Sequence, residues 1–131
     1  MCHAFSGAAL RVLPLDLTSP ASIRGFVDAL TASFPSIDLL INNAGVMAVP
    51  LRRTEDEFDS QFDTNHLSHF ALAGLLFERV RPDGRIVCMS SVEHRRSKDI
   101  DLSYPNWQKR PFSPWAAYRD SKLPICSSCL N

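Results

Sequence analysis

The stretch Ile37-Asp-Leu-Leu-Ile-Asn-Asn-Ala-Gly45 (IDLLINNAG) decides the fold of this chain. Its first five residues are mostly apolar, which is typical of a short buried strand. Its last four are polar or small and end in glycine, which is typical of a loop. The sequence therefore predicts a strand over residues 37–41 that runs into a loop ending near Arg53.

A strand and a helix are predicted upstream of this stretch. Residues 10–15 (LRVLPL) predict a strand, which Pro14 confines to a sheet edge or a strand end. A hydroxyl cap at Thr18 or Ser19, followed by Pro20, indicates a helix start. Apolar residues then recur on one face of that helix until Pro35 ends it: Ile23, Phe26, Val27, Leu30 and Phe34.

The same alternation continues downstream. Thr54 and Glu57 form the pattern of a capping box, so a helix is predicted from Thr54 to about Val80. Its segment Phe70–Phe77 is apolar on all sides, which predicts neighbours on more than one face. Residues 81–84 predict a turn. A strand over 85–89, a loop over 93–114 and a helix from Trp115 complete the pattern.

Strands alternating with helices predict an α/β fold with a parallel sheet. In such sheets ligands bind at the carboxyl ends of the strands. Polar or small residues follow all three predicted strands: Asp16, then Asn42 to Gly45, then Ser90 and Ser91. We therefore expect the functional site at this edge of the sheet.

Composition excludes several classes of function. The chain has 131 residues, enough for one domain, with 14 Lys and Arg balancing 14 Asp and Glu. A neutral chain gives no electrostatic case for nucleic acid. We find no signal peptide and no apolar run long enough to span a bilayer, so we expect a soluble, cytoplasmic protein. The spacing Cys126-x-x-Cys129 lacks a second ligand pair, and we interpret it as incidental.

Four motifs in order carry a resemblance over roughly residues 10–123. Asn42-Asn43-Ala44-Gly45, then Asn65, then Ser91, then Tyr118-Arg119-Asp120-Ser121-Lys122 resemble the short-chain dehydrogenase/reductase family. The long interval between Ser91 and Tyr118 and the phrase Asn65-His-Leu-Ser-His-Phe70 resemble its retinol-dehydrogenase-like branch, which includes the WW-domain oxidoreductase.

The resemblance implies a catalytic group of Asn65, Ser91, Tyr118 and Lys122. A free tyrosine has a pKa near ~10, and a nearby ammonium favours its phenolate. Tyr118 would then exchange a proton with a substrate oxygen that Ser91 holds. Asn65 would bind a water linked to Lys122 at a local break in its helix. The alternatives are a strand-end cap for Ser91 and a helix-surface side chain for Asn65.

The resemblance also implies NAD or NADP as cofactor, with NADP favoured by the branch. Lys122 and Tyr118 would contact it. The other cofactor-binding residues would be Asp16, Leu17, Asn43, Ala44 and Gly45, whereas Asn42 would tie neighbouring strands together. Asp16 can equally be a loop residue before the helix cap. His66 and His69 lack a third ligand, so we predict no metal site.

The implied substrate is a small lipophilic alcohol or carbonyl compound, interconverted by hydride transfer. The implied partner is a second copy, bound through Phe70–Phe77 and the Tyr118 helix. The basic cluster of residues 94–98 could meet an anionic ligand, but we favour a solvated surface.

The sequence departs from the family in two places. It holds no Gly-x-x-x-Gly-x-Gly turn, so we expect residues 1–131 to be a single partial domain that lacks the family's first two strand–helix units and its C-terminal part. We predict a three-stranded sheet in which residues 10–15 lie beside residues 37–41. Residues 124–131 depart from the family's helix, are a candidate aberrant tail, and place Pro124 where it disturbs that helix.

Two functional hypotheses follow from these departures. The first is a partial NAD(P)-dependent oxidoreductase that is inactive as this chain alone. The second is a non-catalytic remnant, or a regulatory or dimerising fragment, of such an enzyme.

Overall fold

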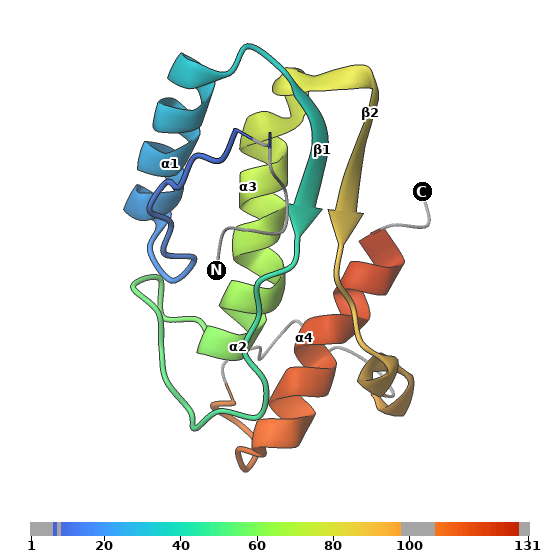
Figure 1. Ribbon diagram of the computed structural model, residues 1–131. Coiled ribbons are helices and arrows are strands. Elements are labelled where there is room, and N and C mark those ends of the chain that lie inside the picture. The colour runs from blue at the N-terminus through green and yellow to red at the C-terminus, as the bar shows by residue number, and fades with distance from the viewer. Residues whose placement is uncertain (1–6, 8, 98–106, 129–131) are drawn as a thin grey trace.

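The chain forms an α/β fold, as the sequence predicts. A computed structural model describes residue 7, residues 9–97 and residues 107–128. Two parallel strands, helices α1, α3 and α4 and shorter helical turns make up this part (Figure 1). The elements in chain order are α1 (Pro20–Ser33), β1 (Ile37–Asn42), α2 (Ser60–Phe62), the π-helix η1 (Asp63–Leu67), α3 (Ser68–Leu76), the 3₁₀ turn η2 (Phe77–Arg79), β2 (Val80–Cys88), the 3₁₀ turn η3 (Val92–Arg96) and α4 (Pro114–Ser128).

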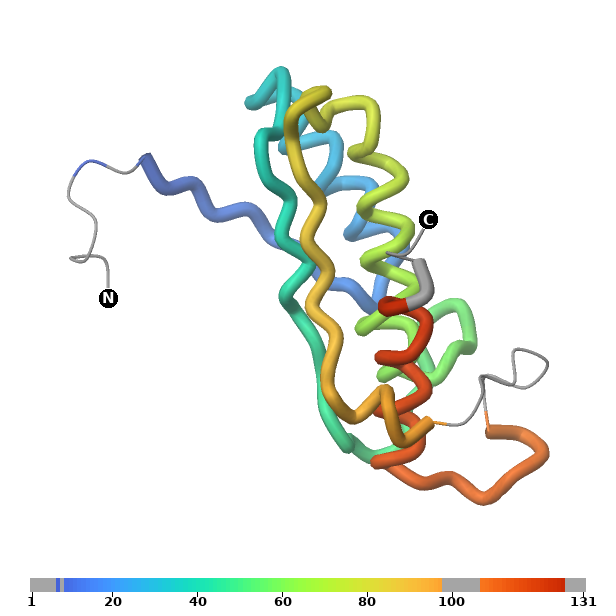
Figure 2. The backbone as a smooth tube through the Cα atoms, turned by 90° about the vertical axis from the view of Figure 1, so that its right-hand side faces the viewer, coloured from blue at the N-terminus to red at the C-terminus, as the bar shows by residue number. Residues whose placement is uncertain are grey.

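The sheet has two strands in the described residues, and the prediction of a third was wrong. Residues 10–15 pair with neither β1 nor β2. Leu10 is 76% exposed and Val12 is 93% exposed. Figure 2 shows this N-terminal arm, residues 9–15, leaving the body on the side of the sheet away from the helices. No described helix covers the arm on that side, so its apolar side chains stay exposed.

Helix α1 follows its local signals. The Ser19 hydroxyl accepts a hydrogen bond from the Ser22 backbone N–H, and Pro20 occupies the first turn. Phe34 ends the helix by donating its N–H to the Leu30 carbonyl, one residue before Pro35. The apolar face packs on α3 and β1 to form the core: Leu17, Ile23, Leu72 and Leu76, with Phe26, Val27, Leu30, Ile37 and Leu40 against them.

The long helical segment begins later than predicted. Thr54 and Glu57 form a turn in which the Glu57 N–H donates to the Thr54 carbonyl. The helix starts at Ser60, and Asp59 caps it by accepting from the Gln61 N–H. Asp59 is fixed by Trp107, whose Nε1 donates to its carboxylate at 3.1 Å. The contact with Trp107, which is distant in sequence, therefore favours Asp59 as the helix cap over the local Thr54 pattern.

Strand β2 includes the residues predicted as a turn. Ile37 pairs with Val80 and Leu39 pairs with Arg85, so residues 81–84 bulge out of the ladder. Arg81 bonds across this bulge to Asp38 at 2.8 Å. The helical segment therefore ends at Arg79, close to the predicted Val80, whereas the turn predicted at 81–84 lies within a strand that starts at Val80.

Helix α4 packs against α2 and η1, which precede α3 in the chain (Figure 1). The Gln61 amide donates to the Pro114 carbonyl at 3.2 Å and fixes the start of α4. The helix continues through Pro124 to Ser128, so Pro124 does not end it. A proline removes one donor, and the turns on either side remain. Cys129 of the Cys-x-x-Cys spacing, Lys98 of the basic cluster and residues 129–131 of the candidate tail lie outside the described residues.

Each helix in the described part of the chain is too short or too polar to cross a bilayer.

Candidate active site

Three of the predicted catalytic residues are buried close to the carboxyl ends of the two strands. Asn65 comes from η1, and Tyr118 and Lys122 come from α4. Asn65 is 1% exposed and Lys122 is 4% exposed. Polar groups at this depth need hydrogen-bond partners, because an unpaired one costs about 1–3 kcal/mol. The partners that they find define the geometry of the site.

The Asn65 side chain bonds to two separate segments. Its amide oxygen accepts from the Val46 N–H at 2.8 Å, and its amide nitrogen donates to the Val46 carbonyl at 2.9 Å. The same nitrogen donates to the Ser121 hydroxyl at 2.9 Å. Asn65 therefore connects the loop after β1 to helix α4.

Asn65 lies within the π-helix η1, which confirms that the helix is irregular at this position. A π turn shifts the backbone bonding by one residue and is frequent at functional sites. The Asn65 carbonyl lies 3.3 Å from His69 Nδ1. The predicted helix-surface alternative for Asn65 does not fit, because the side chain is fully enclosed.

Lys122 reaches from α4 to the end of β2. Its ammonium donates to the Met89 carbonyl at 3.0 Å and lies 5.9 Å from the centre of the Tyr118 ring. Burial lowers the pKa of Lys122 from its usual value. The arrangement places the Lys122 ammonium beside the Tyr118 ring.

Gly45 lies where Asn65 and Lys122 converge. A Cβ atom on Gly45 would come within 2.9 Å of the Asn65 amide oxygen and 3.5 Å of Lys122 Nζ. Real Cβ atoms almost never make the first of these contacts, and the Val46 N–H holds that oxygen in place. The glycine of Asn-Asn-Ala-Gly is therefore required by the close approach of Asn65.

Ser121 is a functional residue that sequence reasoning missed. It is fully buried, accepts from the Asn65 amide and donates to the Tyr118 carbonyl at 2.7 Å. It therefore connects Asn65 to the backbone of the tyrosine. The available signal was its position one turn after Tyr118, on the side of α4 that the tyrosine and lysine share.

Ser91 follows β2 and caps the 3₁₀ turn η3. Its hydroxyl accepts from the Glu93 N–H at 3.3 Å at the start of η3. Ser90, in contrast, contacts α4 directly: its hydroxyl donates to the Lys122 carbonyl at 3.0 Å and lies 3.0 Å from Cys126 Sγ. In the described residues the strand-end cap is thus the observed contact of the Ser91 hydroxyl.

The basic segment after β2 is held against α4 by one ion pair and one hydrogen bond. Glu93 pairs with Arg119 at 3.2 Å and with Arg96 at 3.0 Å. Ser97 donates to Asp120 at 2.7 Å. These contacts fix η3 beside α4, and they place part of the predicted solvated cluster in a structural role.

The predicted cofactor residues lie at two places. Asn43, Ala44 and Gly45 form an exposed loop at the end of β1. Asp16 lies exposed before α1 and accepts from the Thr18 N–H and hydroxyl, and these bonds lower its pKa. Leu17 is buried, and its carbonyl accepts from the Ser68 hydroxyl. The structure therefore joins the 43–45 loop to the Lys122 region and leaves Asp16 in its own turn.

Two further predictions concern Asn42 and the histidine pair, His66 and His69. Asn42 is buried and ties the strands together, since its amide lies 3.6 Å from Cys88 Sγ and its carbonyl accepts from the Met89 N–H. Within the described residues no group of three potential ligands surrounds His66 and His69.

Comparisons with known proteins find related chains. Residues 3–104 match the family model described as "Enoyl-(Acyl carrier protein) reductase". Retinol dehydrogenase 13 of Homo sapiens is 44% identical over 113 residues, which cover 85% of this chain and 34% of the relative. The chain thus spans about a third of that curated relative.

Solved structures show the same fold. An uncharacterized protein from Mycobacterium Paratuberculosis superposes with a TM-score of 0.74 at 47% identity, covering 82% of this chain and 38% of that protein. A short-chain dehydrogenase/reductase from Burkholderia multivorans with bound NADP gives a TM-score of 0.58 at 26% identity, covering 88% of this chain and 46% of that protein.

Proposed function

Because this chain belongs to the short-chain dehydrogenase/reductase family, we propose that it supplies the proton-transfer part of an NAD(P)-dependent oxidoreductase. The reaction is the interconversion of an alcohol and a carbonyl compound. The observation that carries the proposal is the buried connection of Asn65, Ser121, Tyr118 and Lys122 at the ends of the strands.

Tyr118 acts as the acid and base in this proposal. In the reductive direction its hydroxyl gives a proton to the forming alkoxide, and in the oxidative direction its phenolate takes that proton back. The Lys122 ammonium stabilises the phenolate. Asn65 and Ser121 hold the helix that carries both side chains, so the distance between them stays fixed.

The residues around Gly45 fit a nicotinamide cofactor. When bound, NAD(P)(H) supplies or accepts the hydride. The exposed backbone of residues 43–45 would line it, and Lys122, 3.5 Å from the Cβ position of Gly45, would contact it on the same side. Asp16 and Leu17 belong to the proposal through the family resemblance. The NADP bound in the Burkholderia multivorans structure supports NADP as the first cofactor to test.

The proposed substrate is a lipophilic alcohol or carbonyl compound. Retinol dehydrogenase 13 is named for such an alcohol, and this supports the assignment. Tyr118→Phe is the direct test, made in a longer chain that holds these residues together with a Gly-rich turn. We expect turnover to fall about a hundredfold to ten-thousandfold with cofactor binding retained.

The matched control is Tyr104→Phe, which changes the chain's other tyrosine. Steady-state kinetics with NADPH and a set of lipophilic aldehydes measures both variants. Turnover by Tyr118→Phe at the unsubstituted rate would remove Tyr118 from the mechanism.

We propose that these 131 residues alone are inactive, because they contain no Gly-x-x-x-Gly-x-Gly turn to hold the pyrophosphate. Titration of the purified chain with NADPH and NADH, followed by nicotinamide fluorescence, tests this. Saturable binding in the micromolar range would contradict it.

A second candidate function is a dimerising fragment. Phe70 and Phe77 are 68% and 63% exposed, and Trp115 on α4 is also exposed. Exposed aromatic side chains in one region favour association. We propose a homodimer through Phe70–Phe77 and α4, which sedimentation velocity over a range of concentrations tests. A monomer at every concentration would rule it out.

A further inference from the structure

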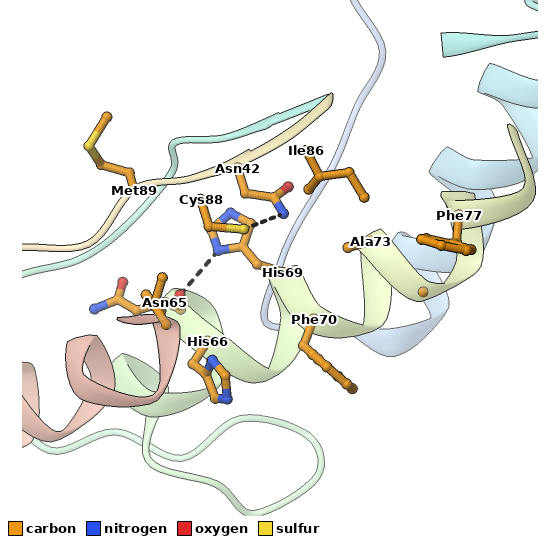
Figure 3. Close-up of a pocket in the computed structure, with 12 residues that line it drawn as sticks. Asn42, Asn65, His66, His69, Phe70, Ala73, Phe77, Ile86, Cys88 and Met89 are labelled. Carbon is orange, nitrogen blue, oxygen red and sulfur yellow. Dashed lines mark hydrogen bonds between the residues drawn. The ribbon is translucent and has the colours of Figure 1, made fainter. Parts of the chain in front are cut away.

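A cleft of about 440 Å³ opens between α3, β2 and the last turns of α4. Figure 3 shows Phe70, Ala73 and Phe77 along its helical side and Ile86 and Cys88 on the strand side. Its volume is that of a small-molecule site. Asn65 of the proposed proton-transfer group lines the cleft, whereas Tyr118, Ser91 and Lys122 do not, so the proposed proton donor lies outside it.

One end of the cleft is polar. His69 points from α3 toward Asn42 and Cys88, as Figure 3 shows. The side chain is 8% exposed, and its Nδ1 lies 3.3 Å from the Asn65 carbonyl. A carbonyl can only accept, so Nδ1 carries the hydrogen and Nε2 is left as an acceptor. Among the described residues Nε2 has no hydrogen-bond donor.

The cleft lining carries no Asp, Glu, Lys or Arg side chain. Burial lowers the pKa of both His66 and His69, although the hydrogen bond to the Asn65 carbonyl acts in the opposite direction on His69. A charged ligand would lose its hydration without gaining an ionic partner. The site therefore selects an uncharged molecule with a hydrogen-bond donor.

We propose that this cleft binds an uncharged, mainly apolar molecule with one hydroxyl group. The hydroxyl donates to His69 Nε2, and the hydrocarbon part lies along Phe70, Ala73 and Phe77. This inference does not depend on the proposed oxidoreductase function, since the cleft can bind its ligand whether or not the chain catalyses a reaction.

Gly74 gives a sharp test. It lines the cleft, and a Cβ atom placed on it meets no atom within 4 Å. Gly74→Leu therefore has room for its Cβ and should place the rest of its side chain in the cleft, in a helix that prefers leucine to glycine. Gly25→Leu is the matched control, because Gly25 lies in helix α1 with the same open space around its Cβ position.

The experiment follows the neutral dye Nile red on the full chain and its displacement by 1-octanol or its isomer 1-methoxyheptane, which cannot donate a hydrogen bond. We expect 1-octanol to displace the dye at about tenfold lower concentration than the ether. We expect dye binding to be lost in Gly74→Leu and kept in Gly25→Leu. Circular dichroism verifies folding, and Ala73→Leu replaces Gly74→Leu if the latter does not fold.

Equal displacement by the two isomers would remove the role of His69. Unchanged dye binding in a folded Gly74→Leu chain, or no dye binding by the unsubstituted chain, would place no ligand in the cleft. Loss of bound dye that depends on protein concentration instead of alcohol concentration would mean that a second copy of the chain occupies the cleft. That result would overturn the proposal.

Discussion

The N-terminal arm and the polar cluster around Asn65 show opposite outcomes of equally clear sequence patterns. The arm, residues 9–15, contains apolar residues that read as a strand, yet Leu10 and Val12 lie exposed. The polar cluster, defined as Asn65, Ser121 and Lys122, is hydrophilic and buried, and it bonds to the backbones of Val46 and Met89.

The difference lies in what each region meets. Every side chain of the polar cluster finds a partner on a different element, so burial does not leave it unsatisfied. The arm has no second layer of structure on its side of the sheet (Figure 2). Apolar surface is stabilising only when another surface covers it. Composition therefore predicts burial less well than the availability of a partner does.

Replacing Asn65 by alanine should have the largest effect on this comparison. The change removes three hydrogen bonds and leaves the Val46 N–H and carbonyl without their partner. We expect the free energy of unfolding to fall by about 3 kcal/mol, measured by urea denaturation. Asn43→Ala, in the exposed loop nearby, should change it by less than about 0.5 kcal/mol. Equal losses in the two variants would mean that the polar cluster does not hold the fold.

Gly45→Ala should have the next largest effect. The added Cβ would come within 2.9 Å of the Asn65 oxygen, so the loop or Asn65 must shift. We expect a loss of about 1–2 kcal/mol in the free energy of unfolding. Gly25→Ala has no atom within 4 Å of the new Cβ and should instead stabilise helix α1 by about 0.5–1 kcal/mol. If both substitutions stabilise the chain, the close approach at Gly45 is not a constraint.

The acid dependence of stability sharpens the comparison further. Burial, and then the charge on His69, lower the pKa of His66 below its usual 6.5. Below pH 6.5 the unfolded chain therefore binds a proton that the folded chain does not, and stability is lost as pH falls toward the lowered pKa. Urea denaturation at several pH values should show this loss. His66→Phe should reduce this loss, because it removes the titrating ring. The phenyl ring can keep the packing, since Phe62 and Phe70 already contact the ring at this position. An unchanged slope in the variant would assign the acid sensitivity to other groups.

Local signals explain which parts of the fold could be predicted. Helix α1 was predicted from Ser19, Pro20 and the apolar spacing, all of which act within one turn or one face. The start of the next helix was missed, because the bond from Trp107 to Asp59 joins residues far apart in sequence. The bulge over residues 81–84 was read as a turn for a similar reason, since only the pairing with β1 keeps it in a strand.

The residues of the candidate site also fall into two groups, those that the sequence identifies and those that only the structure identifies. The family resemblance placed Asn65, Tyr118 and Lys122, and the structure brings them to one buried region. Ser121 and His69 lie within the quoted motifs, but their contacts with Asn65 appear only in three dimensions. Asp16 illustrates the converse, because its position after a predicted strand did not bring it into contact with the polar cluster among the residues that the structure describes.

The smallest effect is expected from the arm itself. Replacing both Leu10 and Val12 by serine removes apolar surface that is already exposed, so the free energy of unfolding should change by less than about 0.5 kcal/mol. Replacing Leu72 and Leu76 of the core by alanine, as the matched pair, should abolish cooperative unfolding, because each buried leucine contributes about 2–5 kcal/mol. Urea denaturation measures both pairs. A large loss from the serine pair would show that the arm packs on the sheet in solution, and the contrast with the polar cluster would then fail.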